Sequence, residues 1–163
     1  MRWRISIRST VALAVFGCVA AATPLLAQTK LNGAWSVVET SGHTAAGDWE
    51  SDPVQPSLFI FMDGYYSVMY VSGSEARPLM ADDATRENIT EEQVRSVFMS
   101  FVANSGTYEI SGSTVTTKPM VALWPNFMEG GSREYQHAIE NGMLVLTAEG
   151  EGWRWTAKLR RLR

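Results

Sequence analysis

Few side chains in this sequence combine a reactive type with a position that suggests chemistry, and His137 is the first of them. It lies in a predicted strand, 133–140, on the same face as Tyr135 and Ile139, because side chains alternate along a strand. A histidine titrates near neutrality, so an inward-facing His137 can act as a general acid or base. The alternative is a surface histidine or one held by a hydrogen bond. The sequence favours this alternative, because a lone titratable residue is a weak marker of a site.

The adjacent residues Tyr108 and Glu109 form the second candidate. They alternate in a predicted strand, so only one of them faces inward. Tyr108 is the expected inward residue, either orienting a ligand through its hydroxyl or filling the core, since a buried tyrosine seeks one polar partner in both cases. An inward Glu109 would instead be a buried acid and a second catalytic candidate.

The aromatic and methionine side chains are numerous enough to line an apolar cavity. Aromatic walls carrying a few polar atoms are typical of small-molecule sites, and methionines let such walls adapt. A filled barrel core uses the same residue types, so that alternative stays open. The predicted ligand-contacting residues are Tyr65, Met69, Tyr108, Met120, Trp124, Tyr135 and Trp155, and Phe59 and Trp153 are further candidates for the wall.

Metal, phosphate and nucleophile chemistry find little support. One histidine, His43, lies near Asp48, Glu50 and Asp52 in a polar stretch, and a solvated loop explains this better than a cation site. The chain has no Gly-rich phosphate loop, nucleophile elbow or HExxH zinc motif. We therefore expect no metal and no cofactor.

The first 27 residues are predicted to be a secretory signal peptide. Three arginines precede a small apolar run, and Ala27 offers a cleavage site before Gln28. The run is shorter than the ~20 residues of a membrane span, so a stable span is not expected. Lipid attachment at Cys18 is a minor alternative. These features predict a periplasmic or secreted protein.

Net charge and cysteine content narrow the classes further. The whole chain carries a net charge of −3, and removal of residues 1–27 would take away three of the 14 basic residues and none of the 17 acidic ones. The resulting charge of −6 argues against a nucleic-acid partner, which needs a basic surface. Cys18 is the single cysteine, so the remaining chain has no disulfide and must be stabilised by packing.

These residues must be positioned by strands, because short apolar runs separated by turn residues recur along the chain. Asp63-Gly64 and Asn141-Gly142 are strong hairpin signals, since both turn positions favour positive φ. The predicted strands are 34–40, 57–62, 65–71, 107–110, 114–121, 133–140, 143–148 and 153–162, with residues 41–56 as a polar loop.

One helix is expected between these strands. The segment Thr90-Glu91-Glu92-Gln93 is a capping box, and an apolar stripe follows from Val94 to Val102. Asn104-Ser105-Gly106 is predicted to end the helix, whose stripe is expected to pack on the barrel or to cover one of its mouths.

The connections define the fold class. Short turns force antiparallel neighbours, and about eight such strands in sequence can close into a barrel wide enough for one small ligand. Closure also removes the exposed sheet edges. We therefore predict an all-β protein, an up-and-down antiparallel barrel of about eight strands with one inserted α-helix, over residues 28–163.

The order of several motifs resembles the bacterial lipocalin-like domain. Leu31-Asn32-Gly33-Ala34-Trp35 is similar to its opening L-x-G-x-W, and Gly106-Thr107-Tyr108-Glu109 to its G-T-Y-E. The resemblance, which covers nearly all of residues 28–163, implies a calycin-type barrel. It further implies structural roles: Gly33 lets the chain bend at the closed end, Trp35 plugs that end, and Arg160 or Arg161 covers the plug by a cation–π contact, with Arg160 as the preferred choice.

Three functions remain open at this point. The first is an exported lipocalin-like protein that binds a small, largely apolar molecule inside the barrel. The second is a cyclase or isomerase in which His137 or Glu109 moves a proton in the same cavity. The third is an envelope interaction module with a filled barrel. The sequence does not define the oligomeric state.

Overall fold

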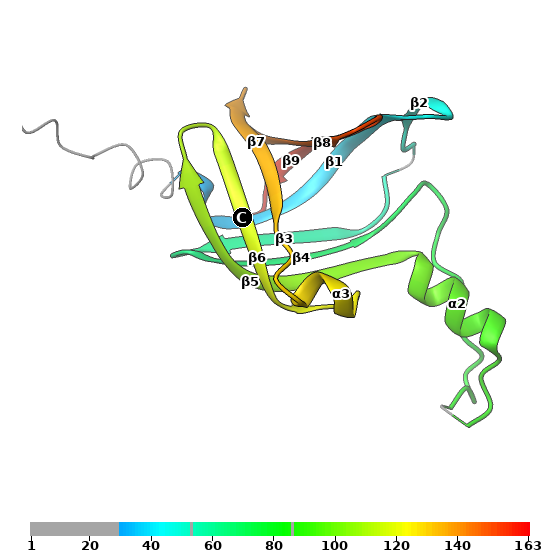
Figure 1. The fold of residues 1–163 in the computed structure, drawn as a ribbon. Helices are drawn as coiled ribbons and strands as arrows, with labels where there is room; N and C mark the ends of the chain where they lie inside the picture. Colours follow the sequence, from blue (N-terminus) through cyan, green and yellow to red (C-terminus); the bar gives the residue numbers. More distant parts are fainter. Residues whose placement is uncertain (1–29, 53, 86) are drawn as a thin grey trace, which may run out of the picture.

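A computed structural model describes residues 30–52, 54–85 and 87–163, and these form one closed antiparallel barrel (Figure 1). The strands follow the order β2-β1-β3-β4-β5-β6-β7-β8-β9, and β1 also pairs with β9. Strand β2 pairs only with β1, so the ring itself consists of β1 and β3 to β9. The predicted all-β, up-and-down barrel of about eight strands is confirmed. The predicted leader, residues 1–27, and Cys18 lie outside the described residues.

Two hairpins match the sequence pattern closely. Strands β3 (Ser57–Met62) and β4 (Tyr65–Val71) are joined by Asp63-Gly64, with φ of 50° and 86°. Strands β7 (Arg133–Glu140) and β8 (Met143–Gly150) are joined by Asn141-Gly142, with φ of 51° and 79°. Two successive positive φ values are the signature of the tight turn that matches strand twist.

Strand β1 (Gly33–Thr44) is longer than predicted, because its C-terminal part forms a further hairpin with β2. Strand β2 (Gly47–Glu50) returns along its end, pairing Ser41 with Glu50 and Thr44 with Gly47. The prediction of a loop over residues 41–56 is wrong for this part. Alternation is weak here because most residues of the hairpin are exposed, so hydrophobicity gives little signal.

The capping box is confirmed, but the helix is shorter than predicted. Helix α2 (Glu91–Met99) begins after Thr90, whose hydroxyl accepts a hydrogen bond from the Gln93 amide, while Gln93 Oε1 accepts one from the Thr90 amide. Strand β5 (Phe101–Ser111) starts two residues after α2 and pairs along the whole of β4. Phe101 and Val102 therefore belong to the sheet, where backbone pairing with β4 replaces two further helical residues.

Helix α2 extends away from the barrel rather than packing along it (Figure 1). None of its residues is buried, and Val94 is 46% exposed. Its C-terminal end is held by Phe98, whose ring meets the edge of Trp124 at a centroid distance of 4.9 Å. The predicted packing of the whole apolar stripe on the barrel is therefore wrong.

The remaining elements complete the ring. Strand β6 (Thr114–Ala122) leads into a short helix, α3 (Pro125–Met128), and strand β9 (Trp153–Arg161) returns beside β1. The connections at one end are all two-residue turns, whereas most of those at the other end are longer. The β3–β4, β5–β6 and β7–β8 turns lie at one end, the base, with Gly33 and Arg161. The described residues of the segments 51–56, 72–100 and 123–132 lie at the other end, the mouth, together with the β8–β9 turn. No helix among the described residues has both the length and the apolar character needed to cross a membrane.

The lower half of the barrel is a packed apolar core. Its members are inward-facing residues of seven strands together with Leu31. The core residues are Leu31, Trp35, Val37, Phe59, Phe61, Tyr66, Val68, Tyr108, Val115, Leu144, Leu146, Ala157 and Leu159.

Trp35 closes the base as the resemblance implied. Its side chain is 1% exposed, and its indole N–H donates to the carbonyl of Leu31 at 2.9 Å. The guanidinium of Arg161 lies 4.2 Å from the ring centroid and also donates to the backbone carbonyls of Lys30 and Asn32. A Cβ at Gly33, where φ is +137°, would meet this guanidinium.

The prediction that Arg160 covers the Trp35 ring is wrong, because the neighbouring Arg161 makes that cation–π contact. Arg161 shares the inward face of β9 with Ala157 and Leu159, and it lies opposite Trp35 in the pairing with β1. Arg160 is exposed on the outer face. Counting every second residue forward from Trp155, through Ala157 and Leu159, selects Arg161 over Arg160.

Candidate functional site

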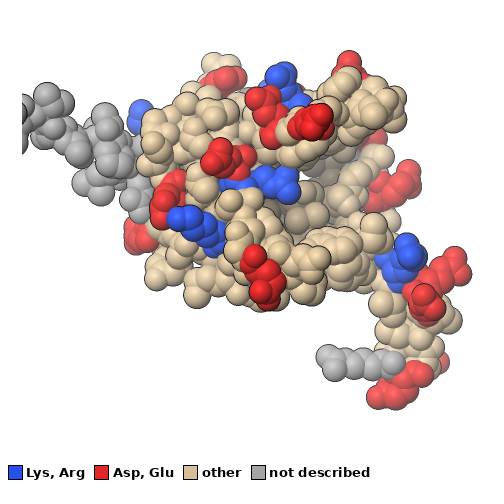
Figure 2. All heavy atoms as spheres, viewed as in Figure 1, with Lys and Arg blue, Asp and Glu red and all other residues tan. Residues whose placement is uncertain are grey.

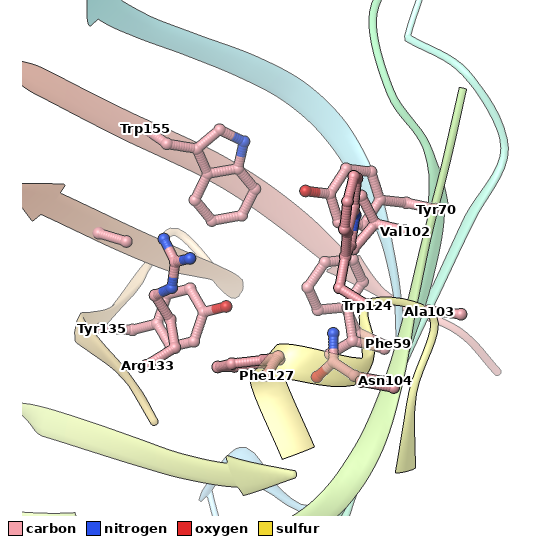
Figure 3. A pocket seen from close by; sticks show the side chains of 13 residues that line it. Phe59, Tyr70, Val102, Ala103, Asn104, Trp124, Phe127, Arg133, Tyr135 and Trp155 are labelled. Atoms are coloured by element: carbon pink, nitrogen blue, oxygen red, sulfur yellow. The ribbon is translucent and has the colours of Figure 1, made fainter. Parts of the chain in front are cut away.

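The upper half of the barrel holds a cavity of about 420 Å³ near the mouth (Figure 3). Seven strands contribute to its wall, and the segment that follows β6 closes one side. Its lining residues are Phe59, Val68, Tyr70, Val102, Ala103, Asn104, Ala122, Trp124, Phe127, Arg133, Tyr135, Ala148 and Trp155.

Aromatic rings form most of this wall and contact one another. Tyr70 stacks between Phe59 and Trp155, with centroid distances of 5.9 and 6.4 Å and interplanar angles of 21° and 27°. The ring of Tyr135 meets Trp155 at 65° and 6.1 Å. Offset and edge-to-face contacts of this kind fix the ring orientations, so the apolar surface is preformed.

Polar groups are few and point into the same space. Figure 3 shows the hydroxyls of Tyr70 and Tyr135 directed inward from opposite sides, with the guanidinium of Arg133 beside Tyr135 and Trp155. The amide of Asn104 lies toward Phe59. Arg133 is the single residue of this lining that carries a formal charge.

The buried tyrosines ionise less readily than an ordinary phenol. Burial raises the pKa of Tyr135 strongly, partly opposed by the positive charge of Arg133. Burial likewise raises the pKa of Tyr70, again opposed by Arg133. The pKa of Tyr66, just below the cavity, is raised by burial and lowered less by the hydroxyl of Thr117. All three phenols are therefore neutral hydrogen-bonding groups at physiological pH.

These shifts predict a loss of stability in alkali. A raised pKa in the folded protein means that the unfolded chain loses its phenolic protons first, so the free energy of unfolding falls as pH rises above about 10. Each tyrosine contributes a slope of up to about 1.4 kcal/mol per pH unit in that window. Urea unfolding between pH 8 and 11.5 measures the slope.

The control for this prediction is a tyrosine on the outer surface. Tyr135→Phe is expected to flatten the alkaline slope, whereas Tyr65→Phe, at a ring that is 62% exposed, is expected to keep the wild-type slope. Equal slopes for Tyr135→Phe and the wild type would contradict the assignment.

A second cavity of about 360 Å³ adjoins the first and shares Tyr70 and Trp155 with it. The paired rings of these two residues thus form a partition between two chambers. The second chamber is lined by Val37, Thr40, Trp49, Ser51, Val54, Gln55, Ser57, Tyr70, Val71, Ser72, Gly73 and Trp155.

The structure places three predicted ligand-contacting residues in the wall of the first chamber: Trp124, Tyr135 and Trp155. Phe59 lines it as well, whereas Trp153 does not. Ligand contact at these positions remains a prediction.

The predicted contacts of Tyr65, Met69 and Met120 are wrong, because all three side chains point outward. They are 62%, 37% and 70% exposed. On β4 the inward positions belong to Tyr66, Val68 and Tyr70. On β6, Met120 is the extra residue of a bulge, where the pairing passes from Pro119 to Val121.

Tyr108 faces inward, but it lies at the base and not in the cavity. It is 4% exposed, its ring meets the edge of Phe61 at 5.4 Å, and its hydroxyl donates to Asn32 Oδ1 at 3.1 Å. Asn32 Nδ2 also donates to Asp63 Oδ1 in the neighbouring turn. Tyr108 is therefore a core residue that ties the base together.

The two catalytic candidates lie outside both chambers. Glu109 takes the outward position next to Tyr108, and its carboxylate forms an ion pair with Lys118 at 2.9 Å on the surface. His137 is on the same face as Tyr135 but closer to the base, where its Nδ1 lies 2.8 Å from the carbonyl of Ser113. A carbonyl accepts only, so Nδ1 carries the proton and the ring holds the end of β7 against the β5–β6 turn. The structure thus contradicts a place for either residue in cavity chemistry.

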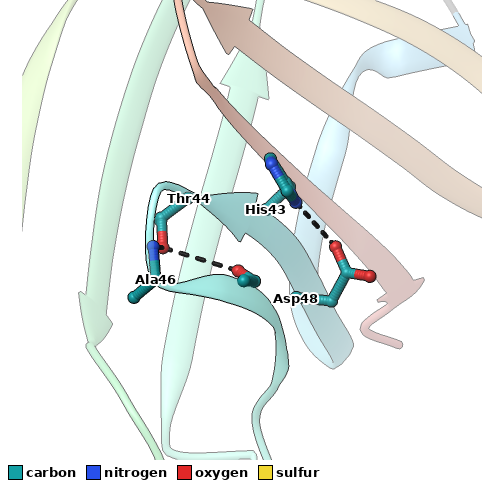
Figure 4. A network of polar contacts seen from close by, with 5 residues as sticks. His43, Thr44, Ala46 and Asp48 are labelled. Carbon is teal, nitrogen blue, oxygen red and sulfur yellow. Dashed lines mark hydrogen bonds and ion pairs between the residues drawn. The ribbon is translucent and has the colours of Figure 1, made fainter.

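The end of β1 and strand β2 form a hairpin with a local hydrogen bond between side chains (Figure 4). His43 Nδ1 lies 2.8 Å from Asp48 Oδ1, and both side chains are exposed. Among the described residues, no group of three or more His, Cys, Asp and Glu side chains is arranged to hold a metal ion.

Two important lining residues, Tyr70 and Arg133, were missed by the sequence analysis. Both follow from alternation: Tyr70 is on the inward face of β4 with Tyr66 and Val68, and Arg133 is two residues before Tyr135. Phe127 and Asn104 had no such signal, because α3 and the start of β5 were not predicted.

A closed eight-stranded antiparallel barrel, packed at its base and hollow at its mouth, defines the class of barrels that can enclose a small ligand. Residues 32–160 match the model of the family described as "Lipocalin-like domain". The chain belongs to this family, as its motifs suggested.

Other comparisons add little. A search of curated proteins gave no significant match. One similar solved structure is that of an uncharacterized protein from Bacteroides eggerthii, with 10% sequence identity and a TM-score of 0.41. The match covers 78% of this chain and 98% of the other, and at that score it carries no argument about function.

Proposed function

We propose that this protein binds a small, largely apolar molecule in the chamber near the mouth. The observation that carries the proposal is the cavity of about 420 Å³, whose aromatic and aliphatic wall is preformed and open to one end of the barrel. Pockets of this size and composition are typical of small-molecule sites. Burial of apolar ligand surface, at ~25 cal/mol per Å², would supply most of the affinity.

The composition of the walls supports binding over proton-transfer catalysis. The residues that line the two chambers include no His, Asp, Glu, Lys or Cys. A cyclase or isomerase that works near neutral pH needs a group that exchanges protons there. The phenols of Tyr70 and Tyr135, with raised pKa values, do not meet that need.

The predicted leader completes the proposal. We place the protein outside the cytoplasm, in the periplasm or the medium, because residues 1–27 have the order of a secretory signal. N-terminal sequencing of protein recovered from each compartment tests this part.

Filling the chamber is expected to abolish binding. Ala148 is 3% exposed and lies opposite Trp155 in the pairing of β8 with β9, so Ala148→Phe places a ring inside the cavity. We expect the Kd of the neutral fluorescent probe N-phenyl-1-naphthylamine to rise at least tenfold, because the ring occupies ligand space. Fluorescence titration of the probe gives the Kd.

The matched control is Ala138→Phe, which adds the same ring at an exposed position on the outside of β7. It is expected to leave the Kd unchanged. Equal affinity in the two variants would overturn the proposal. If Ala148→Phe alone loses affinity, native mass spectrometry of protein purified from its own compartment is expected to identify the molecule that the chamber retains.

A further inference from the structure

We propose that the ligand carries a carboxylate and that Arg133 binds it together with the hydroxyls of Tyr70 and Tyr135. This inference rests on the proposed function and deepens it, because it assigns a chemical class to the molecule in the chamber.

The first argument is the charge of the wall. The lining of the first chamber combines apolar and aromatic residues with one formal charge, and that charge is positive. The chain as a whole is acidic, with 17 acidic and 14 basic residues. Acidic side chains also occur on α2, which projects from the barrel (Figure 2). Arg133, an exposed residue that lines the chamber, therefore supplies the one charge of the lining, and its sign is opposite to that of the chain as a whole.

The second argument is that Arg133 has no ion-pair partner among the described residues. Carboxylates neutralise other cations on the outer surface, as in the pairs Lys118–Glu109, Arg154–Glu149 and Lys158–Glu39. The Arg133 guanidinium instead lies 5.3 Å from the ring centroid of Trp153, a cation–π contact that leaves its N–H donors available. A planar guanidinium recognises a carboxylate through two parallel hydrogen bonds.

The third argument is the position of the tyrosine hydroxyls. The positive charge of Arg133 lowers the pKa of both Tyr70 and Tyr135 against the effect of burial, so the cation is close enough to act on both phenols. Both hydroxyls point into the chamber (Figure 3). A protonated phenol donates a hydrogen bond, and an arginine with two such donors is suited to the oxygens of one carboxylate.

The shape of the interior then orients the molecule. Arg133 belongs to the first chamber, and the second chamber, beyond the Tyr70–Trp155 partition, has no charged lining residue. An apolar body with a single acidic end fits this arrangement, with the acid at Arg133 and the body against the aromatic wall.

The test compares two probes that differ only at the acidic end. Naphthalene-1-acetate carries a carboxylate, and 2-(1-naphthyl)ethanol carries a hydroxyl in its place. Isothermal titration calorimetry of the wild type, Arg133→Gln and Arg160→Gln gives the Kd of each. Arg160→Gln is the matched control, because it removes the same charge on the outer face near the base.

We expect the wild type to prefer the carboxylate probe by at least tenfold, as a charge-assisted hydrogen bond predicts. Arg133→Gln is expected to abolish the preference while changing the Kd of the alcohol less than twofold. Arg133→Lys is expected to restore part of it, because an ammonium keeps the charge but loses the planar fork. Arg160→Gln is expected to keep the full preference.

Other outcomes separate the two proposals. Equal binding of acid and alcohol by the wild type, or an equal change of both in Arg133→Gln, would overturn the carboxylate assignment and leave the binding function intact. If N-phenyl-1-naphthylamine binds Ala148→Phe and the wild type alike, the binding function itself fails. A purely structural Arg133, which only stacks on Trp153, would change stability without changing the ratio of the two Kd values.

Discussion

Replacing Trp35 by alanine is expected to lower the free energy of unfolding by about 4 kcal/mol, within the range observed for buried large aromatic residues. The indole is 1% exposed, it donates a hydrogen bond to the Leu31 carbonyl, and it supports the guanidinium of Arg161. Its removal leaves a hole at the base that the closed ring of strands cannot collapse to fill. Urea unfolding followed by far-UV circular dichroism measures the change without relying on the lost fluorophore.

Two variants make this prediction specific. Trp35→Phe retains an apolar ring but loses the hydrogen bond to Leu31, so we expect a smaller loss than for alanine. Arg160→Ala removes a neighbouring exposed residue that does not cover the indole, and its effect is expected to stay within about 0.5 kcal/mol. A midpoint for Trp35→Ala equal to that of Arg160→Ala would show that the base does not depend on the plug.

Replacing Gly106 by valine is expected to cost about 3 kcal/mol, because two backbones approach closely at this residue. A Cβ on Gly106 would lie 2.1 Å from the carbonyl oxygen of Lys118 and 2.8 Å from the amide nitrogen of Met120. Both atoms belong to the backbone of β6, which cannot move without breaking its pairing with β5. Thermal and urea unfolding are expected to shift together.

The control for Gly106 is the next residue on the same strand. Thr107→Val adds a β-branched side chain of the same shape on the other face of β5, where threonine already fits, and it is expected to change stability little. If Gly106→Val is as stable as Thr107→Val, the pairing of β5 with β6 tolerates a side chain at the bulge, and the argument from close approach fails.

The parts of the fold that the sequence predicted are those with strong local signals. Asp63-Gly64 and Asn141-Gly142 meet the positive φ that their turns need, so the strands on either side were located correctly. The capping box placed the start of α2 for the same reason: two side chains satisfy specific backbone groups within one turn.

The errors lie where tertiary pairing overrides a local pattern. Phe101 and Val102 continue the helical spacing of α2, yet pairing with Val71 and Tyr70 draws them into β5. The β1–β2 hairpin is mostly exposed, and β2 has only four residues, so its alternation is too short to mark a strand.

The site was harder to predict than the fold, because residue type does not determine which face a side chain occupies. Tyr65 and Met69 have suitable side chains but lie on the outward face of β4. Tyr70 has a suitable side chain and lies on the inward face, where it lines the cavity. Met120 shares the outward face of β6 with Lys118, and the bulge adds Val121 to that face. Arg133 was overlooked because it is an exposed cation at the start of a strand, and residue type alone does not indicate that such a side chain lines a cavity.

The two ends of the barrel are also expected to differ in how well they tolerate substitutions. At the base, two-residue turns, Trp35 and Arg161 fix the strands, and a substitution there affects folding directly. At the mouth, Ser72 and Gly73 after β4, and Trp124 and Phe127 after β6, contribute to the walls of the chambers from connections between strands that are already paired. Loop length adds only slowly to the free energy of closure. Changes of length or sequence in these connections are therefore expected to alter the shape of the chambers while leaving the paired strands in place.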